Sequence, residues 1–297
     1  MVRRYFLFFT LLVSACTSPA TASSRSGPTV LASTTVLADI TQNVAGARIQ
    51  VETLLPFGAD PHSYQLTPQD VARISDSDLL IINGAGFEQF LKNALEATGG
   101  ERTVVEASAG LTAATGGQAE KMEVDPHYWL DPNNVTIYAA NIREGLSRID
   151  PGGAEVYQAN AEAYIEQLHA LDAWINEQVS AIPVERRLLV TNHDSLGYFA
   201  RRYGFTLIGT VVPGFSSDAA PSAQQMAALI DQIKSSGAPA VFLDAAESTT
   251  LADQIASDAG VSVVTDLHIG SLTDGAPAGT YVDMMKYNVT QMVKALK

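Results

Sequence analysis

Apolar residues follow two alternating periodicities along this chain, and the alternation predicts an α/β fold. Short runs rich in aliphatic and β-branched residues have the length of strands, and stretches with helical spacing lie between them. The predicted strands are Val30–Ser33, Ile49–Leu55, Leu79–Asn83, Thr103–Glu106, Leu188–Thr191, Thr206–Val212, Ala240–Asp244 and Val261–Thr265. Strands that alternate with helices in this way predict largely parallel sheets.

One long helix interrupts the alternation in the middle of the chain. Its apolar positions recur three and four residues apart, at Tyr157, Ala161, Tyr164, Leu168, Leu171, Ile175, Val179 and Ile182. Nearly thirty residues at ~1.5 Å each predict a rod of roughly 45 Å, which Pro183 ends. We expect this rod to be a rigid spine over residues 151–183. It would join an N-terminal α/β lobe over 29–150 to a C-terminal α/β lobe over 184–297.

The first residues have the pattern of an export signal. Arg3 and Arg4 precede an apolar core that is shorter than the ~20 residues needed to span a bilayer. Small residues then precede Cys16, the only cysteine, and this ending resembles a bacterial lipobox. A lone exported thiol has no disulfide partner, which supports lipidation. We predict a signal peptide over 1–15, then a lipidated cysteine with a flexible tether over 16–28.

Composition excludes one class of partner. Loss of Arg3 and Arg4 with the signal takes the formal net charge from −14 to −16. Binding of nucleic acid requires basic patches, so nucleic acid is excluded as a partner. The sequence has no second apolar run long enough to cross a membrane, so we expect the lipid to be its membrane anchor.

Three histidines and one aspartate are the candidate functional residues. His62 and His127 each end an Asp-Pro-His triplet, and His193 directly follows the predicted strand that ends at Thr191. Asp266 likewise follows a predicted strand end. Three neutral imidazoles with one carboxylate suit a divalent transition metal. No single helix or hairpin could join positions so distant in sequence, so the site is expected between the lobes.

The two remaining histidines have different surroundings. His169 has polar neighbours within the long helix and is predicted to be solvated. His268 lies two residues after Asp266, so in an extended segment both side chains would point the same way. His268 is therefore a rival to Asp266 for the fourth ligand position.

Four segments carry a resemblance to a known family. They are Gly58–Gln65, Asp125–Pro132, Thr191–Phe199 and Gly279–Met285, and together they extend over nearly the whole mature chain. The chain resembles the zinc- and manganese-binding solute-binding proteins of bacterial ABC importers, the ZnuA/TroA-like cluster A-I family. The resemblance implies two α/β lobes joined by a rigid helix, with metal bound in the cleft. It also implies His62, His127, His193 and Asp266 as the four ligands.

The function that this resemblance implies is metal transport without catalysis. A monomer held by its lipid anchor, in the periplasm or on the outer face of the cytoplasmic membrane, would pass metal to an ABC permease and its ATPase. Some zinc-binding relatives carry a long histidine-rich loop, which the short segment Leu111–Asp125 lacks. Manganese-selective relatives often have a glutamate where this chain has His193. The extra imidazole favours Zn²⁺, with Mn²⁺ as the alternative.

Two other functions are considered. A metal-dependent hydrolase would need a general base, for which Glu247 or Asp194 would be candidates, yet the chain has no His-Glu-x-x-His and no Gly-x-Ser-x-Gly motif. A surface adhesin or metallochaperone would hold the metal as a structural ligand. For the transport protein, protons compete with metal for the imidazoles, so metal affinity is expected to fall near a pH of ~6.5.

Overall fold

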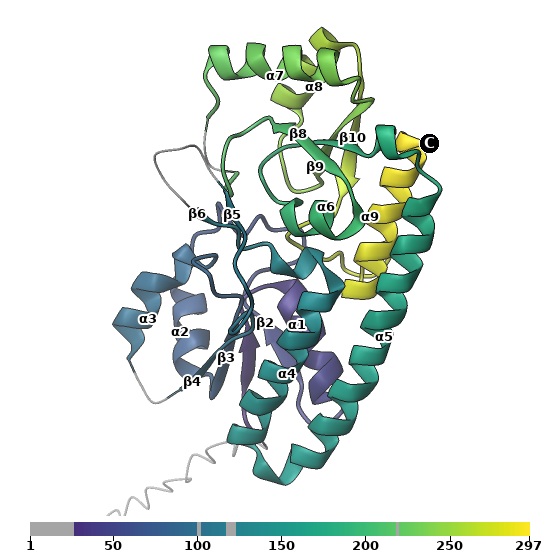
Figure 1. The fold of residues 1–297 in the computed structure, drawn as a ribbon. Coiled ribbons are helices and arrows are strands. Elements are labelled where there is room, and N and C mark those ends of the chain that lie inside the picture. The colour runs from purple at the N-terminus through teal and green to yellow at the C-terminus, as the bar shows by residue number, and fades with distance from the viewer. Residues whose placement is uncertain (1–26, 100–101, 117–122, 218–219) are drawn as a thin grey trace, which may run out of the picture.

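Two wholly parallel four-stranded sheets form the centres of two α/β lobes (Figure 1). The computed structural model describes residues 27–99, 102–116, 123–217 and 220–297. The first sheet has the order β2-β1-β3-β4, with β1 Val30–Ala32, β2 Val51–Thr53, β3 Leu79–Ile82 and β4 Thr103–Glu106. The second has the order β10-β9-β7-β8, with β7 Leu188–Thr191, β8 Thr206–Thr210, β9 Ala240–Asp244 and β10 Ser262–Leu267. The predicted α/β class with two parallel-sheet lobes is confirmed.

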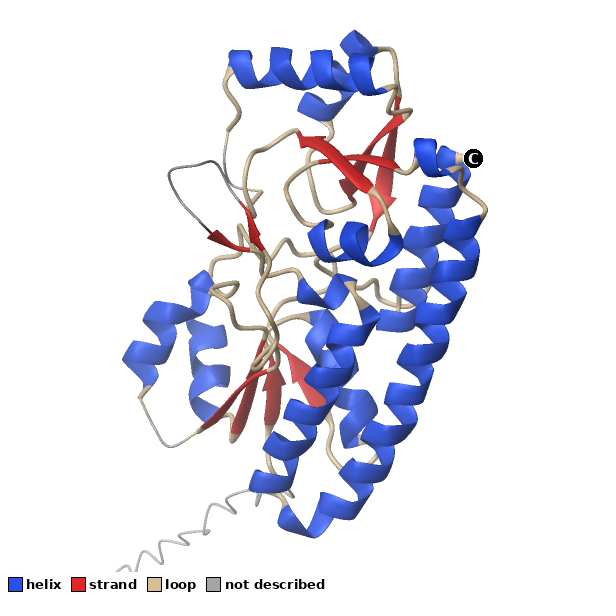
Figure 2. Ribbon diagram, viewed as in Figure 1, coloured by secondary structure: helices blue, strands red, loops and turns tan. Residues whose placement is uncertain are grey.

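Both faces of each sheet are buried beneath helices, which explains why the strands are continuously apolar. In the first sheet Leu31 and Leu80 pack with residues of α2 and α3, whereas Val30 and Ile81 pack with residues of α1 and α4. Helices lie on both sides of this sheet (Figure 2). The helices of this lobe are α1 Thr35–Ala45, α2 Pro68–Asp76, α3 Lys92–Thr98 and α4 Pro132–Ile149. Those of the second lobe are α6 Gly197–Tyr203, α7 Ala223–Ser236, α8 Thr250–Ala259 and α9 Tyr281–Leu296.

The differences from the predicted strands lie at their ends and in one extra hairpin. The run Ile49–Leu55 yields only the three residues of β2, at the edge of its sheet. Strand β10 continues to Leu267, past the predicted end at Thr265, so Asp266 lies within the strand. A short antiparallel pair, β5 Thr115–Gly116 and β6 Glu123–Val124, begins in a stretch of small residues that had no strand pattern.

The long helix predicted in mid-chain is α5, Ala154–Ser180, of 27 residues. It extends along both lobes, beside α4 and α1 of the first lobe and α9 at the C-terminus (Figure 1). All eight apolar positions that predicted it are buried, namely Tyr157, Ala161, Tyr164, Leu168, Leu171, Ile175, Val179 and Ile182. A one-sided apolar face therefore identified both the helix and its packing surface.

One acidic residue of α5 connects the two lobes. The carboxylate of Asp172 accepts hydrogen bonds from Asn133 Nδ2 of the first lobe at 3.1 Å and from Tyr203 OH of the second at 2.9 Å. Arg202 adds an ion pair from the second lobe, with Nε 3.0 Å from Oδ1 of the same carboxylate. Side chains from both lobes thus meet on the spine helix.

The predicted signal peptide, Cys16 and most of the tether lie outside the described residues. Within the ranges that are described, no helix combines the length and apolar character needed to cross a bilayer.

Candidate metal centre

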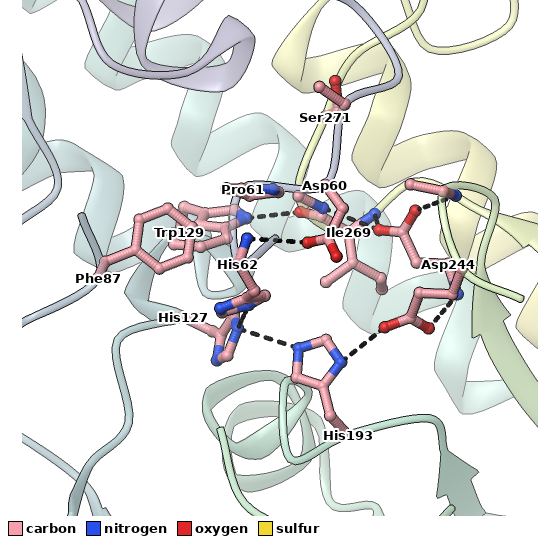
Figure 3. A pocket seen from close by; sticks show the side chains of 14 residues that line it. Asp60, Pro61, His62, Phe87, His127, Trp129, His193, Asp244, Ile269 and Ser271 are labelled. Carbon is pink, nitrogen blue, oxygen red and sulfur yellow. Dashed lines mark hydrogen bonds and ion pairs between the residues drawn. The ribbon is translucent and has the colours of Figure 1, made fainter. Parts of the chain in front are cut away.

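Three loops bring His62, His127 and His193 together between the lobes (Figure 3). His62 lies in the loop after β2, and His193 lies in the loop after β7. His127 directly precedes a short 3₁₀ helix, Tyr128–Leu130. The Nε2 atom of His127 is 3.4 Å from that of His62 and 3.3 Å from that of His193. The ranges that the structure describes contain no other group of histidine, cysteine and acidic ligand atoms clustered as closely as this one.

The two Asp-Pro-His triplets share one hydrogen bond from the aspartate side chain to the histidine backbone. Asp60 Oδ1 accepts the backbone N–H of His62 at 2.9 Å, and Asp125 Oδ1 accepts that of His127 at 2.9 Å. An aspartate side chain that bonds the backbone two residues on makes a tight turn, and the intervening proline has no N–H to compete. In each triplet the aspartate therefore holds the backbone of the histidine in place within its loop.

The second lobe presents His193 at the crevice where the strand order of its parallel sheet reverses. In the order β10-β9-β7-β8 the connections diverge between β7 and β9, and ligands bind beyond the carboxyl ends of strands at such points. His193 follows β7, and Glu247 follows β9. The Nδ1–H of His193 donates to Glu247 Oε1 at 2.8 Å, so the two loops meet through this bond.

Carboxylates determine which ring nitrogen is free in two of the three histidines. His127 Nδ1 lies 2.9 Å from Asp125 Oδ1, and His193 Nδ1 has the equivalent contact with Glu247. Because a carboxylate accepts, each neutral ring carries its proton on Nδ1 and a lone pair on Nε2. Two lone pairs then face each other across 3.3 Å. A cation bound by both nitrogens satisfies this arrangement.

The spacing of the nitrogens also suits a tetrahedral metal. With Zn–N bonds of about 2.0–2.1 Å, the ligand atoms of a regular tetrahedron are about 3.3–3.4 Å apart. The separations of 3.3 and 3.4 Å from His127 Nε2 to its neighbours match that edge length. Two edges of a tetrahedral zinc site are thus already in place, and the ligand atoms of all three histidines lie within 4.8 Å of one another.

Asp266 does not join the three histidines. The prediction placed it after a strand end, but β10 extends through it, and its carboxylate accepts a hydrogen bond from Tyr287 OH of α9. Its rival His268 is also elsewhere, since its ring lies against that of Tyr287 in a tilted arrangement with centroids 5.5 Å apart. His169 lies on the exposed face of α5 as predicted, with 54% of its side chain exposed. The expected fourth ligand thus has no counterpart at either position.

An aromatic wall and the loop after β10 complete the pocket, and neither was among the predicted site residues. Phe87 contacts the ring of His62, with centroids 5.3 Å apart. Trp129 lies 5.3 Å from the His127 ring and donates its indole N–H to the Ile269 carbonyl at 2.8 Å, across the lobe boundary. Asp60, Asp244 and Glu247 also line the pocket. The aromatic residue two positions after His127 was the one local signal for this wall.

Asp125 is enclosed by the second lobe as well as by its own turn. Its side chain is 3% exposed, and a Cβ on Gly197 of α6 would lie 2.6 Å from Asp125 Oδ2. Only glycine allows this close approach. Burial raises the pKa of Asp125 to about 7, against the lowering effect of the His127 backbone N–H.

Burial keeps two of the imidazoles uncharged. It lowers the pKa of His62 to about 4, with a further lowering from the neighbouring His193, and it lowers the pKa of His127 well below its usual value. Both rings are therefore neutral, and able to bind metal, at pH values well below 6.5. The expected loss of metal binding near ~6.5 shifts to lower pH for His62.

The contribution of His62 to the stability of the metal-free protein should decrease as the pH falls from 6.5 toward 4. The pKa of His62 is about 4 in the folded protein and 6.5 as the reference value, so the unfolded chain binds more protons in this window. Urea unfolding with a chelator present, at several pH values, should show about 3 kcal/mol of this dependence from His62. The measurement is the difference between wild type and His62→Gln.

Comparison with the variant is needed because other groups titrate in the same range. Burial raises the pKa of Glu88 and of Asp125 to about 7, so these carboxyls favour the folded state as the pH falls. The same pH dependence in wild type and His62→Gln would contradict the neutral, buried state of His62.

Known proteins share this architecture along almost the whole chain. Residues 30–295 match the family described as zinc-uptake complex component A, periplasmic. The manganese-binding lipoprotein MntA of Halalkalibacterium halodurans is 35% identical over 289 residues, which cover 96% of this chain and 95% of MntA. The iron-binding protein YfeA of Yersinia pestis is 33% identical over 267 residues, covering 89% and 85% of the two chains.

A solved structure agrees with the sequence matches. The periplasmic zinc-binding protein TroA of Treponema pallidum superposes with a TM-score of 0.85 at 30% identity, covering 91% of this chain and 99% of TroA. The relatives are metal-binding proteins, and the present chain has the same two-lobed fold with a histidine cluster between the lobes. The chain therefore belongs to the family of the periplasmic zinc-uptake complex component A.

Proposed function

We propose that this protein captures a divalent transition metal outside the cytoplasmic membrane and delivers it to an ABC permease with its ATPase. The observation that carries the proposal is the convergence of three Nε2 atoms, two of them with their lone pairs directed inward by a carboxylate on the far side of the ring. Relatives named as metal ABC transporter substrate-binding lipoproteins support the transport role.

His62, His127 and His193 are the proposed metal ligands. Asp266 is not retained in the set, because its carboxylate is held by Tyr287 on α9. The first lobe, residues 29–150, contributes two of the ligands, and the second, 184–297, contributes the third, while residues 151–183 link them. Metal bound here would bridge the two lobes.

Zinc is the proposed cargo, and manganese is the alternative. Three imidazoles are a nitrogen-rich set, and both ligand type and the general order of divalent affinities favour Zn²⁺ over Mn²⁺. The nitrogen spacing also suits tetrahedral zinc. The names of relatives include zinc, manganese and iron binders, so they support a transition metal without selecting one.

The proposed location is outside the cytoplasmic membrane, through a lipid on Cys16. The support is the lipobox-like sequence at that residue together with relatives named as lipoproteins. In this arrangement the protein is a monomer held near its permease by the tether over 16–28.

Competition between zinc and manganese tests the proposal directly. The chain without its first 28 residues, purified without a histidine tag and stripped with a chelator, should retain one equivalent of zinc in the presence of excess manganese. Elemental mass spectrometry after desalting measures the bound metal. Ready exchange for manganese would change the cargo to manganese, and no stoichiometric metal after reloading would contradict the metal-binding function itself.

No observation favours the alternative functions. Glu247, one candidate base of a hydrolase, lies against Nδ1 of His193, on the opposite side of the ring from the point where the Nε2 atoms converge. The other candidate, Asp194, is not among the residues that line the pocket of the three histidines. The relatives reported above are binding proteins.

A further inference from the structure

We propose that Glu247 is a positioning residue that sets the metal affinity of this site through His193, an inference that rests on the proposed function. It contacts no converging nitrogen itself. Its Oε1 accepts the Nδ1–H of His193 at 2.8 Å, and it approaches the ring from the loop after β9.

The carboxylate of Glu247 is built into the site. Its side chain is 6% exposed, next to a His193 side chain that is 5% exposed. Its second oxygen, Oε2, accepts the backbone N–H of Asp244 at 3.3 Å, and its own backbone N–H donates to the Asp244 carbonyl at 3.0 Å. A side chain held at both oxygens presents its charge to the imidazole in one orientation. This rigidity distinguishes it from a surface carboxylate that meets a histidine by chance.

The chemical effect of this bond is on the tautomer of His193. A neutral imidazole carries one proton, and the group that bonds one nitrogen determines which nitrogen the metal can use. With Glu247 present, the proton is held on Nδ1 and the lone pair of Nε2 faces His127. Without it, the proton can move to Nε2, where metal binding must displace it. The negative charge behind the ring also makes Nε2 a stronger donor to a metal.

Glu247 is more informative than the equivalent group at His127. Asp125 bonds both the ring and the backbone N–H of His127, so changing it also disturbs the loop that carries the ligand. Glu247 lies in the loop after β9, and its side chain bonds the His193 loop at the imidazole ring. Replacement of Glu247 therefore changes the imidazole while leaving the turn of the ligand loop in place.

The absence of Asp266 from the histidine cluster makes the negative charge of Glu247 more important for metal binding. The three imidazoles supply no negative charge, and the carboxylate expected to supply it is bonded to Tyr287 instead. Charge compensation for a divalent cation then comes from carboxylates behind the rings, and Glu247 is the one that the second lobe contributes to an imidazole. The ligand set and its compensating charges thus come from both lobes.

The test compares Glu247→Ala and Glu247→Gln with Asp266→Asn as the matched control. Zinc affinity is measured by competition with a chromogenic chelator in mildly alkaline buffer. Loss of a group that orients a metal-bound histidine weakens metal affinity about 10–100-fold, which is the expectation for Glu247→Ala. Glu247→Gln keeps an acceptor for Nδ1–H but loses the charge, so its loss should be smaller than that of alanine. Asp266→Asn should bind zinc like the wild type.

Two spectroscopic readouts separate positioning from other roles. Long-range ¹H–¹⁵N spectra of the metal-free protein should show the Nδ1–H tautomer of His193 in the wild type and a shift toward Nε2–H in Glu247→Ala. The absorption bands of the Co²⁺-loaded protein should be the same in the wild type and in Glu247→Ala, which would indicate the same metal coordination. A change of coordination in Glu247→Ala would instead make Glu247 a direct ligand and would overturn the positioning role.

The outcomes also separate this inference from the proposed function. If the wild type binds no zinc, the function fails, whatever the variants do. If the wild type binds zinc and Glu247→Ala binds it equally well with an unchanged tautomer, only the role of Glu247 is refuted. A folded Glu247→Ala, judged by its circular dichroism, with weakened zinc binding and an altered tautomer supports the proposal.

Discussion

His127→Ala should abolish the retention of stoichiometric zinc after desalting. The Nε2 atom of His127 is the central one of the cluster, 3.4 Å from that of His62 and 3.3 Å from that of His193. Its side chain is 1% exposed, so no neighbouring group can easily take its place. Loss of a group that merely orients a ligand costs about 10–100-fold in affinity, so loss of the ligand itself should exceed ~100-fold. Chelator competition measures the change.

The matched control is His169→Ala, the same substitution on the exposed face of α5. It should leave zinc affinity unchanged within error, because the ring lies on the solvent side of the spine helix. Similar zinc affinity in His127→Ala and wild type would show that the metal binds elsewhere. The assignment of all three ligands would then fail together, since His127 contacts both of the others.

Zinc should raise the melting temperature of the metal-free protein substantially. Folding brings together ligands from three loops in two lobes, so the unfolded chain cannot offer the same site. A ligand that binds only the folded state at a thousand times its dissociation constant stabilises it by about 4 kcal/mol. For a chain of this size each kcal/mol shifts the melting temperature by about 2–4 °C, which predicts a rise of about 8–16 °C. Calorimetry of the stripped and reloaded protein provides the measurement.

The same experiment on His127→Ala separates site binding from general salt effects. Zinc at equal concentration should raise its melting temperature by far less, and a chelator should return the reloaded wild type to its metal-free value. An equal rise in the variant would mean that zinc stabilises the fold through surface carboxylates, which an acidic chain of net charge −14 has in excess.

The strands and the spine helix could be predicted from local pattern because burial imposes periodicity. Val241 and Phe242 of β9 face opposite sides of a sheet that helices cover on both faces. The four residues before Asp244 in this strand are therefore all apolar. Leu168 and Leu171 lie three residues apart on the single buried face of α5. In each case the information lies within one element.

The end of β10 shows where local pattern was insufficient. The apolar run suggested a strand ending at Thr265, which would have released Asp266 into the cleft. The strand continues because Leu267 pairs with Asp244 after a register shift, and Asp266 then faces Tyr287 of α9. The position of Asp266 is thus determined by the pairing of β10 with β9 and by the hydroxyl of Tyr287. Neither is visible in the residues around Asp266.

The candidate ligands illustrate the same division. The Asp-Pro-His triplets at His62 and His127, and the strand end before His193, identified the three imidazoles, because a turn that presents a ring is encoded by neighbouring residues. That Glu247 would be bonded to the far nitrogen of His193 could not be derived, because β9 and β7 become neighbours only in the assembled sheet. Steric contacts and hydrogen bonds between residues close in sequence produce recognisable sequence patterns. Contacts between loops depend instead on how strands pair and lobes pack.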